Sequence, residues 1–460
     1  MTQYDVVVIG GGPGGLAAAA AARKAGAEQV VLMEREADAG GILKQCIHDG
    51  FGLIRYGEEL TGPEYAGRIK REAENAGVRI LYGHHVTKVG ADRTITVHAE
   101  DGIKSVQAKA VIAATGCRER TRGAISIPGS RPAGIYTAGA AQNLLNIHNV
   151  MAGKKIVILG SGDIGLIMAR RFMLEGADVR CVVEIRKEPC GLARNVSQCL
   201  FDFDIPLFVS HTVSKIIGKK RLQAVEITEV DEHMSLIPDT AEIIECDTLV
   251  LSVGLIPENE ILKYTGIVLN ENNSVPTDRF LQTEISGIFS CGNSRHVMDL
   301  ADYVSRQGEA AGRNAVHFIR GEKMEEWDDR VTNCMEKGFP KKDTITCTIC
   351  PNGCQIKYAR PDGRVSGSRC VRGEAFALAE KNNPKRTITS TVRIEGSGHQ
   401  ALGHKLVPIR TAQKVKKERL LHVMGQIKEI RLEKAVHAGD IVAAVTDGEE
   451  KIDVIATATV

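Results

Sequence analysis

The sequence predicts an α/β protein in which one strand–helix–strand arrangement occurs twice, followed by a smaller module rich in β-structure. Three observations predict it. An apolar strand, a run of spaced glycines and an apolar helix begin at Tyr4, and the same order begins again at Lys154. Residues 422–445 and 450–460 alternate with period two and contain Gly-Asp turns, which is typical of strands. The 460 residues are enough for two or three domains.

The first copy of the arrangement has the features of a site for a dinucleotide. Its strand ends at Ile9, and the glycines that follow allow a tight turn, close approach of a pyrophosphate and close packing of the helix on the strand. A second apolar strand, Val30–Met33, ends in Glu34, whose carboxylate can accept hydrogen bonds from ribose hydroxyls. The glycines of this turn are Gly10, Gly12, Gly14 and Gly15.

The second copy repeats every part in the same order. A strand at Ile156–Leu159 leads into the glycines, and the next strand, Val179–Val183, ends in Glu184. In both copies the acid follows the first glycine at the same distance along the chain. Repetition of the complete order is a much stronger signal than one glycine motif, so we predict two Rossmann-like dinucleotide-binding domains. The glycines of the second turn are Gly160, Gly162 and Gly165.

Composition and charge argue against several other classes of protein. The formal net charge of +2, without a basic run interleaved with aromatic residues, gives no sign of a nucleic-acid partner. No stretch is apolar and long enough to span a bilayer. The chain passes from Met1 directly into an apolar strand, so we expect no signal peptide and a cytoplasmic location. Twelve cysteines in such a chain are expected to be free thiols or metal ligands.

Residues 1–330 resemble the flavoprotein superfamily with paired FAD- and NAD(P)-binding domains. Ala110–Gly116 resembles the segment where that family's chain leaves the FAD domain, Thr248–Glu258 resembles its return, and Ser286–Asn293 resembles the segment that closes over the flavin's ribityl chain. The resemblance implies an NAD domain inserted in the FAD domain. It also implies two parts, 1–120 with 245–325 for FAD and 121–244 for NAD(H). The charge-rich residues that follow indicate a linker at 326–342, and the cysteines and strand patterns beyond it indicate a C-terminal four-cysteine domain at 343–460.

The same resemblance implies which residues bind each cofactor. Asn293 stands where the family usually has aspartate; its amide can still bond a ribityl hydroxyl, but a negative charge is lost. The residues implied for FAD are Gly10, Gly12, Gly14, Gly15, Glu34, Gly41, Val86, Thr115, Gly116, Gly292 and Asn293. Those implied for NAD are Gly160, Gly162, Gly165 and Glu184. Glu184 would repel a 2′-phosphate and therefore favours NADH over NADPH.

The cysteine pair that disulfide reductases of this superfamily use is absent. The segment GGILKQCIHDGFGL contains one cysteine, Cys46, and the cysteines of the second domain do not fit a C-x2-C spacing. Cys46 with His48 is therefore either a reactive thiolate beside the flavin or a packed cysteine in a loop that faces the cofactor. We name no other catalytic residue, because hydride transfer from nicotinamide to flavin requires position rather than an acid or a base.

Four cysteines follow the second domain with the spacing C-x2-C-x3-C-x15-C. Three thiols in one loop and a fourth further on suit a [4Fe–4S] cluster, whereas structural zinc sites usually pair two short C-x2-C turns. Free or redox-switching thiols are the third alternative. The stretch resembles the iron–sulfur lobe of molybdopterin oxidoreductases, with Arg372 where that family has lysine. The predicted ligands are Cys347, Cys350, Cys354 and Cys370.

A narrower resemblance implies a partner protein. Ala114–Leu145 resembles flavoprotein subunits of amine and hydroxy-acid dehydrogenases, among them sarcosine oxidase and proline dehydrogenase complexes, and the segment around Cys46 resembles flavoproteins associated with glycerol-3-phosphate dehydrogenase-like partners. We therefore expect an NADH-linked electron-transfer subunit of a dehydrogenase complex. Two alternatives stay open: a self-sufficient NADH oxidase or reductase that uses oxygen, quinone or polysulfide, and a flavoprotein with a zinc-stabilised docking domain.

Overall fold

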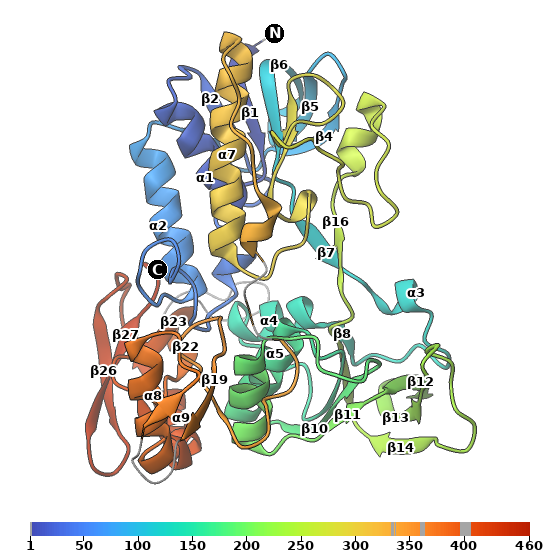
Figure 1. Ribbon diagram of the computed structural model, residues 1–460, viewed down its shortest axis with the longest axis vertical. Coiled ribbons are helices and arrows are strands. Elements are labelled where there is room, and N and C mark those ends of the chain that lie inside the picture. Colours follow the sequence, from blue (N-terminus) through green and yellow to red (C-terminus); the bar gives the residue numbers. More distant parts are fainter. Residues whose placement is uncertain (1, 333–334, 336, 359–363, 396–405) are drawn as a thin grey trace. The chain divides into compact units, whose positions relative to one another are not determined.

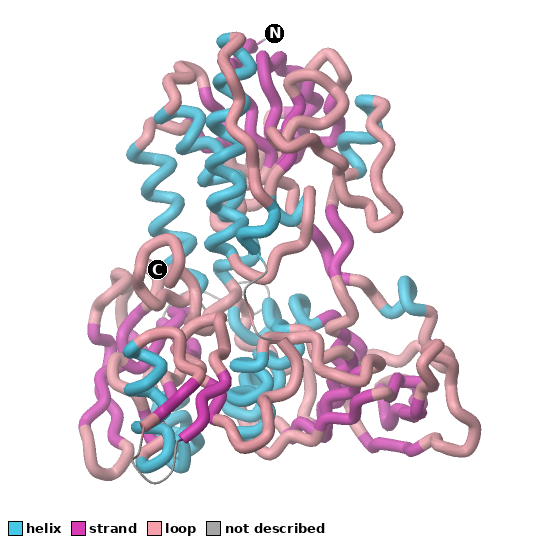
Figure 2. The backbone as a smooth tube through the Cα atoms, viewed as in Figure 1, coloured by secondary structure: helices cyan, strands magenta, loops and turns pink. Residues whose placement is uncertain are grey.

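The computed structural model describes residues 2–332, 335, 337–358, 364–395 and 406–460 (Figures 1 and 2). The chain divides into two compact units. The first consists of Met1–Arg118 and Leu255–Asn333, and the second of Glu119–Gly254 and Cys334–Val460. Where the chain leaves and re-enters the first unit, β7 (Cys117–Glu119) and β16 (Leu255–Pro257) pair as a two-stranded sheet. The four-part division at 120, 245, 326 and 343 stays a prediction.

The first unit is built on a seven-stranded sheet in the order β3-β2-β1-β6-β5-β4, with β17 beside β6. Side chains of β1 alternate between two cores: Val6 and Val8 pack with the helices, while Val7 and Ile9 pack on the opposite face. The strands are β1 (Thr2–Ile9), β2 (Val30–Met33), β3 (Arg79–Leu81), β4 (His85–Val89), β5 (Thr94–Ala99), β6 (Gly102–Ala113) and β17 (Ile288–Ser290).

Three helices supply the helical core of this unit: α1 (Pro13–Lys24), α2 (Gly62–Asn75) and α7 (Ala301–Arg320), which lie together in Figure 1. The alanines of α1 are buried, because small side chains let α7 approach closely. A Cβ at Gly308 would collide with the carbonyl of Gly14. This packing fixes the start of α1 against α7.

The second unit opens with a parallel five-stranded sheet in the order β11-β10-β9-β15-β8. Its strands are β8 (Ile135–Thr137), β9 (Lys155–Leu159), β10 (Asp178–Glu184), β11 (Leu207–Val209) and β15 (Thr248–Leu251). Two helices, α4 (Ala138–Asn146) and α5 (Asp163–Leu174), pack on one face. The other face packs on an antiparallel sheet of β12 (His211–Gly218), β13 (Leu222–Glu229) and β14 (Glu242–Glu245).

The mixed sheet of the first unit and the parallel sheet inserted between its halves, each packed with helices, confirm the predicted fold class. Short irregular helices follow β7 and β10: α3 (Arg122–Ile125), α6 (Ala193–Asn195) and a π-helical turn at Val196–Leu200. None of the helices in the described parts of the chain combines the length and the apolar character that crossing a membrane requires.

The C-terminal part of the second unit forms a β-rich module, as predicted. A small sheet of β18 (Ile345–Thr346), β19 (Gln355–Tyr358) and β20 (Val365–Ser366) precedes α8 (Val371–Asn382). A five-stranded sheet follows, made of β22 (Thr389–Ile394), β23 (Leu406–Thr411), β25 (Arg431–Leu432), β26 (Ile441–Thr446) and β27 (Lys451–Ala456). Two short strands, β21 (Lys385–Arg386) and β24 (Val415–Lys416), pair beside it.

One expectation for this module was wrong. The stretch from 422 onward was expected to be strand, but Leu420–Glu429 is the helix α9. Its apolar residues Leu420, Val423 and Ile427 recur with helical spacing and are all buried against the sheet. Helical periodicity therefore outweighs the period-two pattern in this stretch.

Candidate functional site

The first glycine turn places free backbone N–H groups at the start of α1. Gly10 has a positive φ of 102°, and a side chain there would collide with the carbonyl of Ala114. The N-cap residue of α1 is Gly12, where a Cβ would meet no atom within 4 Å, and no side chain caps the helix. The start of α1 therefore offers unpaired donors and the positive end of the helix dipole to an anion.

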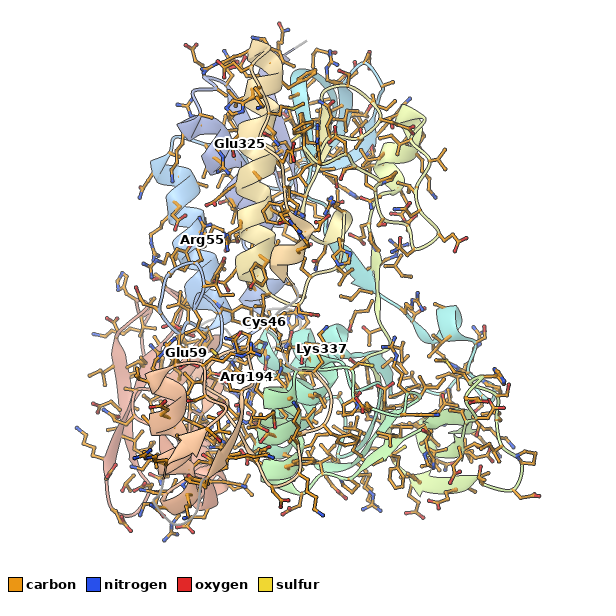
Figure 3. All side chains as sticks on the ribbon, viewed as in Figure 1. Cys46, Arg55, Glu59, Arg194, Glu325 and Lys337 are labelled. Carbon is orange, nitrogen blue, oxygen red and sulfur yellow. The ribbon has the colours of Figure 1, made fainter. Side chains whose placement is uncertain are left out.

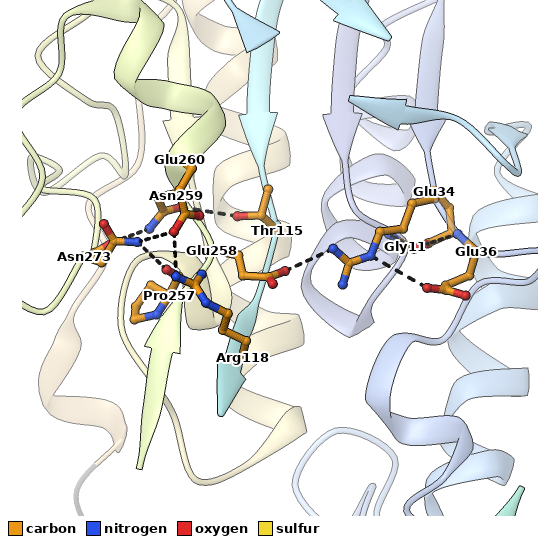
Figure 4. A network of polar contacts seen from close by, with 11 residues as sticks. Gly11, Glu34, Glu36, Thr115, Arg118, Pro257, Glu258, Asn259, Glu260 and Asn273 are labelled. Atoms are coloured by element: carbon orange, nitrogen blue, oxygen red, sulfur yellow. Dashed lines mark hydrogen bonds and ion pairs between the residues drawn. The ribbon is translucent and has the colours of Figure 1, made fainter. Parts of the chain in front are cut away.

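Glu34 closes this turn from the end of β2 (Figure 4). Its carboxylate is 6% exposed and accepts hydrogen bonds from the backbone N–H groups of Gly11, at 2.7 Å, and Glu36, at 2.9 Å. Each oxygen keeps a further lone pair, which can accept from a hydroxyl such as those of ribose. The carboxylate thus orders the turn and remains a candidate ribose acceptor.

A second set of contacts in Figure 4 joins the segments at which the chain leaves and re-enters the first unit. Thr115 donates from Oγ1 to Asn259 Oδ1 at 3.3 Å, and Arg118 pairs with Glu260 at 2.7 Å. Asn259 is fully buried and donates to the carbonyl of Asn273 at 2.8 Å. Beside Thr115, Gly116 has a φ of 74°, and a Cβ there would meet no atom within 4 Å. The predicted FAD residues Thr115 and Gly116 therefore lie on a segment with fixed geometry.

The remaining residues predicted for FAD lie in several places around the first sheet. Gly41 lies against the first turn, where a Cβ would come within 3.1 Å of Gly12 Cα. Gly292 donates its N–H to the buried Gln307 at 2.8 Å. Val86 is buried in β4, paired with Val97.

Asn293 is engaged by the protein itself. Its Oδ1 accepts from the N–H of Met298 at 3.1 Å, and its Nδ2 donates to the sulfur of Cys117 at 3.5 Å. The side chain therefore orders the segment after β17. Its role toward a ribityl hydroxyl stays a prediction.

The second glycine turn repeats the geometry of the first. Gly160 has a φ of 97°, Gly162 precedes α5 without a side-chain cap, and a Cβ at Gly165 would lie 2.7 Å from the carbonyl of Gly160. Glu184 is 3% exposed and accepts from the N–H groups of Ser161, at 2.9 Å, and Arg186, at 3.0 Å. The two turns thus use their glutamates in the same way.

A loop that the sequence did not single out lies against the second turn. The N–H of Gly191 donates to the carbonyl of Ser161 at 3.0 Å. The N–H of Leu192 and the side-chain amide of Asn195 both donate to Asp163 Oδ1 at 2.8 Å. Residues 190–195 therefore extend the site beyond the glycines, and they contain the buried Arg194. No motif marks this segment, because it is held by backbone contacts of an irregular turn.

Cys46 and His48 lie in the loop between Gly41 and the start of α2 (Cys46 is labelled in Figure 3). Burial raises the pKa of Cys46 to about 12, so the group is a neutral thiol at pH 7. His48 stacks on Phe51, with ring centroids 4.9 Å apart.

Further along this loop, Arg55 lies between α2 and α7, where it pairs with Glu72 at 2.8 Å and Glu309 at 2.6 Å (Figure 3). The loop is thus anchored to the helices of the first unit, and its geometry favours the packed-cysteine interpretation.

The four predicted metal ligands lie in one lobe of the second unit. Three occupy the loop between β18 and β19, where the N–H of Cys347 donates to the carbonyl of Cys354 at 2.9 Å. Cys370 is exposed and immediately precedes α8. Burial raises the pKa of Cys347 to about 11, and the other three thiols add to the shift.

The cysteines are free thiols throughout the described residues. Within those same residues, no three side chains of His, Cys, Asp or Glu are arranged so that they could hold a metal ion. The donor chemistry of four thiols suits soft metal centres, but in this structure the sulfurs are not set at ligand positions around a common point. Cys334 lies outside the described residues.

The paired turns define a class of protein with two dinucleotide sites on two Rossmann-like domains. Comparison with known families agrees: the family described as pyridine nucleotide-disulphide oxidoreductase matches residues 4–308, and the chain belongs to it. The protein is accordingly an FAD-dependent NAD(P)H oxidoreductase. Residues 371–458 match a second family, described as a protein of unknown function (DUF1667).

Individual relatives are distant. The chain is 24% identical to thioredoxin reductase of Listeria innocua over 69% of its own length and 94% of that protein. It is 23% identical to the NAD(P)H coenzyme A polysulfide/persulfide reductase of Pyrococcus horikoshii, of which it spans only 50%. The crystal structure of Lactococcus lactis thioredoxin reductase aligns with a TM-score of 0.57 at 23% identity, covering 69% of this chain and 99% of that one. This likeness concerns the fold.

Proposed function

We propose that the protein moves electrons between NAD(H), FAD and a [4Fe–4S] cluster held by Cys347, Cys350, Cys354 and Cys370. FAD, when bound, exchanges hydride with nicotinamide and can release its two electrons singly, which suits a one-electron carrier such as a cluster. In this proposal the first turn, with Glu34, holds FAD and the second, with Glu184, holds NAD(H). The chain's own contribution is to place the two cofactors and to supply the thiols.

The single observation that carries the proposal is the gathering of the four cysteines in a lobe that shares a compact unit with the second glycine turn. The segment that leads into the lobe contacts the loop beside that turn. The N–H of Gly338 donates to the carbonyl of Gly191 at 3.2 Å, and the backbones of Leu192 and Lys337 form an antiparallel β-bridge. An electron carrier is useful only near an electron source, and this attachment ties the thiols to the nucleotide-binding domain.

A second consideration is that three buried cysteines of the two glycine-turn domains are poorly suited to a dithiol relay. Burial raises the pKa of Cys46, Cys181 and Cys246 to about 12 in each case, which disfavours the thiolates that disulfide exchange requires. This disfavours disulfide exchange at these cysteines as the exit for electrons from a flavin. In the proposal the four-cysteine lobe is the exit instead.

The choice of NADH rests on Glu184. A buried carboxylate that closes the turn repels a 2′-phosphate and accepts from a free 2′-hydroxyl. A dehydrogenase subunit acting on glycerol 3-phosphate or a hydroxy acid is the proposed partner. Its support is the resemblance of Ala114–Leu145 and of the segment around Cys46 to flavoproteins of such complexes.

The test is anaerobic purification followed by analysis for iron, acid-labile sulfide and zinc, with visible spectra before and after NADH. We expect flavin, iron and sulfide, and loss of the iron in Cys347→Ser while flavin is retained. Cys181→Ser, a buried cysteine of the second domain, is the matched control. Flavin without iron overturns the cluster, zinc alone indicates a docking domain, and a flavin that NADH does not reduce overturns the proposal as a whole.

A second candidate is a self-sufficient reductase that uses polysulfide, oxygen or quinone. The relatives favour it, since one is named as a polysulfide/persulfide reductase and the chain spans 94% of a thioredoxin reductase. Turnover with small acceptors as fast as with any protein partner, reduced in Cys46→Ser, would support this candidate. Turnover unaffected by that substitution would count against it.

A further inference from the structure

Arg194 is a buried cation whose Nε finds no hydrogen-bond acceptor in the described part of the chain. Its side chain is 4% exposed and its Nε is fully buried without a hydrogen bond. Among the residues that the structure describes, no carboxylate forms an ion pair with its guanidinium. Moving a charged group from water into the protein interior costs several kcal/mol unless an opposite charge offsets the cost. A guanidinium in this state therefore calls for an anion.

The other buried arginines of this protein show what a satisfied guanidinium looks like here. Arg171, which is 5% exposed, pairs with Glu175 and donates to Asn146 at 3.0 Å. Arg386, also 5% exposed, pairs with Asp202 at 2.6 Å. Arg194 departs from this rule within the same unit. Its missing counter-charge is therefore a local feature and not a general property of the chain.

The position of Arg194 indicates which anion is missing. Its neighbours Leu192 and Asn195 are fixed to Asp163, the first residue of α5, so that residues 190–195 lie at the N-terminus of this helix. No side chain caps α5 at Gly162, and its first N–H groups are available. The loop that carries Arg194 is thus fixed at the positive end of a twelve-residue helix. The carboxylate of Asp163 holds the loop in place.

The backbone that follows Arg194 is unusual as well. It continues as a π-helical turn, Val196–Leu200, instead of an ordinary helix. Such turns are rare, and they occur frequently at functional sites because they re-aim side chains at a local cost. The turn starts two residues after Arg194, and its residues Val196 and Leu200 are fully buried.

We propose that Arg194 and the N-terminus of α5 together bind the pyrophosphate of the nicotinamide dinucleotide. Within this corner the carboxylates of Asp163 and Glu184 are engaged by backbone and side-chain donors, and a pyrophosphate would bring the anion that the guanidinium of Arg194 does not find among them. Guanidinium–phosphate pairs are among the stronger charge-assisted hydrogen bonds. The inference rests on the proposed function in one respect, that the second glycine turn holds NAD(H). It adds a residue that the glycine motif does not contain.

The test is calorimetric binding of ADP-ribose, which contains the pyrophosphate but no nicotinamide, to the flavin-loaded protein and to Arg194→Met. We expect the Kd for ADP-ribose to rise about tenfold or more, as for a lost hydrogen bond to a charged group. Adenosine, which has no phosphate, should lose far less affinity. Arg180→Met, an exposed arginine of β10 that pairs with Asp178, is the matched control and should bind ADP-ribose as the unmodified protein does.

Thermal unfolding without nucleotide separates binding from a structural role. Because the Nε of Arg194 finds no acceptor in the described part of the chain, Arg194→Met should unfold at the same temperature as the unmodified protein or higher, while ADP-ribose should raise its Tm less. A lower Tm without nucleotide, or an unchanged Kd for ADP-ribose, would overturn the inference. If the unmodified protein itself fails to bind ADP-ribose and NADH, the proposed function fails instead.

Discussion

Glu184 and Glu34 have the same two backbone donors. Each buried carboxylate accepts from the N–H of the residue after the first glycine of its turn and from the N–H of the residue two positions after the glutamate. Glu184 accepts in addition from the hydroxyl of Ser161. This equivalence makes the charge of Glu184 testable. Glu184→Gln keeps an acceptor oxygen but removes the charge, so the ratio of kcat/KM for NADPH over that for NADH should rise on the order of tenfold. Stopped-flow reduction of the flavin measures the ratio. Glu188→Gln, an exposed acid in the same loop, is the control. An unchanged ratio in Glu184→Gln would remove the carboxylate from coenzyme selection.

Cys46 provides a pH-dependent prediction at the same scale. Burial raises its pKa to about 12, so the thiolate fraction falls about tenfold for each pH unit below that value. Alkylation of Cys46 by iodoacetamide in the folded protein should be slow at pH 7 and accelerate with pH up to pH 9. Peptide mass spectrometry after timed labelling measures the rate, and the same cysteine in urea-unfolded protein serves as the control. Labelling at pH 7 as fast as in the unfolded chain would favour the reactive-thiolate interpretation.

The element scale shows which parts of the structure local sequence patterns can predict. Both glycine turns and their strands were predictable, because strand, glycine spacing and terminal acid constrain one another within about 30 residues. The helix α9 was misassigned from alternating residues, although Leu420, Val423, Met424 and Ile427 have helical spacing. The loop at residues 190–195 and its buried Arg194 could not be predicted at all. The loop is fixed by contacts of Leu192 and Asn195 with Asp163, which lies 29 residues before Leu192, and no local pattern records such contacts.

Within α9, Gly425 tests the helix assignment. It is exposed, its φ is not positive, and a Cβ there would meet nothing within 4 Å. Alanine restricts the unfolded chain and favours a helix, so Gly425→Ala should raise the free energy of unfolding by about 0.5–1 kcal/mol. Chemical denaturation measures the change. Gly439→Ala is the contrasting control, because its φ of 97° strains any side chain and should lower stability. Destabilisation by Gly425→Ala would favour the strand that the alternation predicted.

At the scale of the whole second unit, the C-terminal module is attached to the nucleotide-binding domain by buried charge as well as by apolar packing. Arg386 lies at the centre, with its Nε 2.6 Å from Asp202 and its Nη1 2.7 Å from Glu380 of α8. Lys417 also pairs with Asp202, at 2.9 Å. Leu174 of α5 packs within the core of the module. Asp202 lies in the short turn Phe201–Phe203 that follows the π-helical turn. The stretch of chain that carries Arg194 therefore also carries the carboxylate that binds Arg386, which pairs in turn with Glu380 of α8.

Arg386→Met tests whether this attachment makes the two parts one cooperative structure. The substitution leaves the carboxylates of Asp202 and Glu380 close together, with Asp202 only 4% exposed in its side chain. Removing one partner of a buried pair costs roughly 3–5 kcal/mol, and the remaining pair with Lys417 should bring the loss toward about 3 kcal/mol. Lys385→Met, which removes the neighbouring and more exposed pair with Glu450, is the control and should cost less than about 1 kcal/mol. Hydrogen exchange should then accelerate in α8 and in residues 201–203 together. Faster exchange in α8 alone would mean that the module unfolds independently of the nucleotide-binding domain.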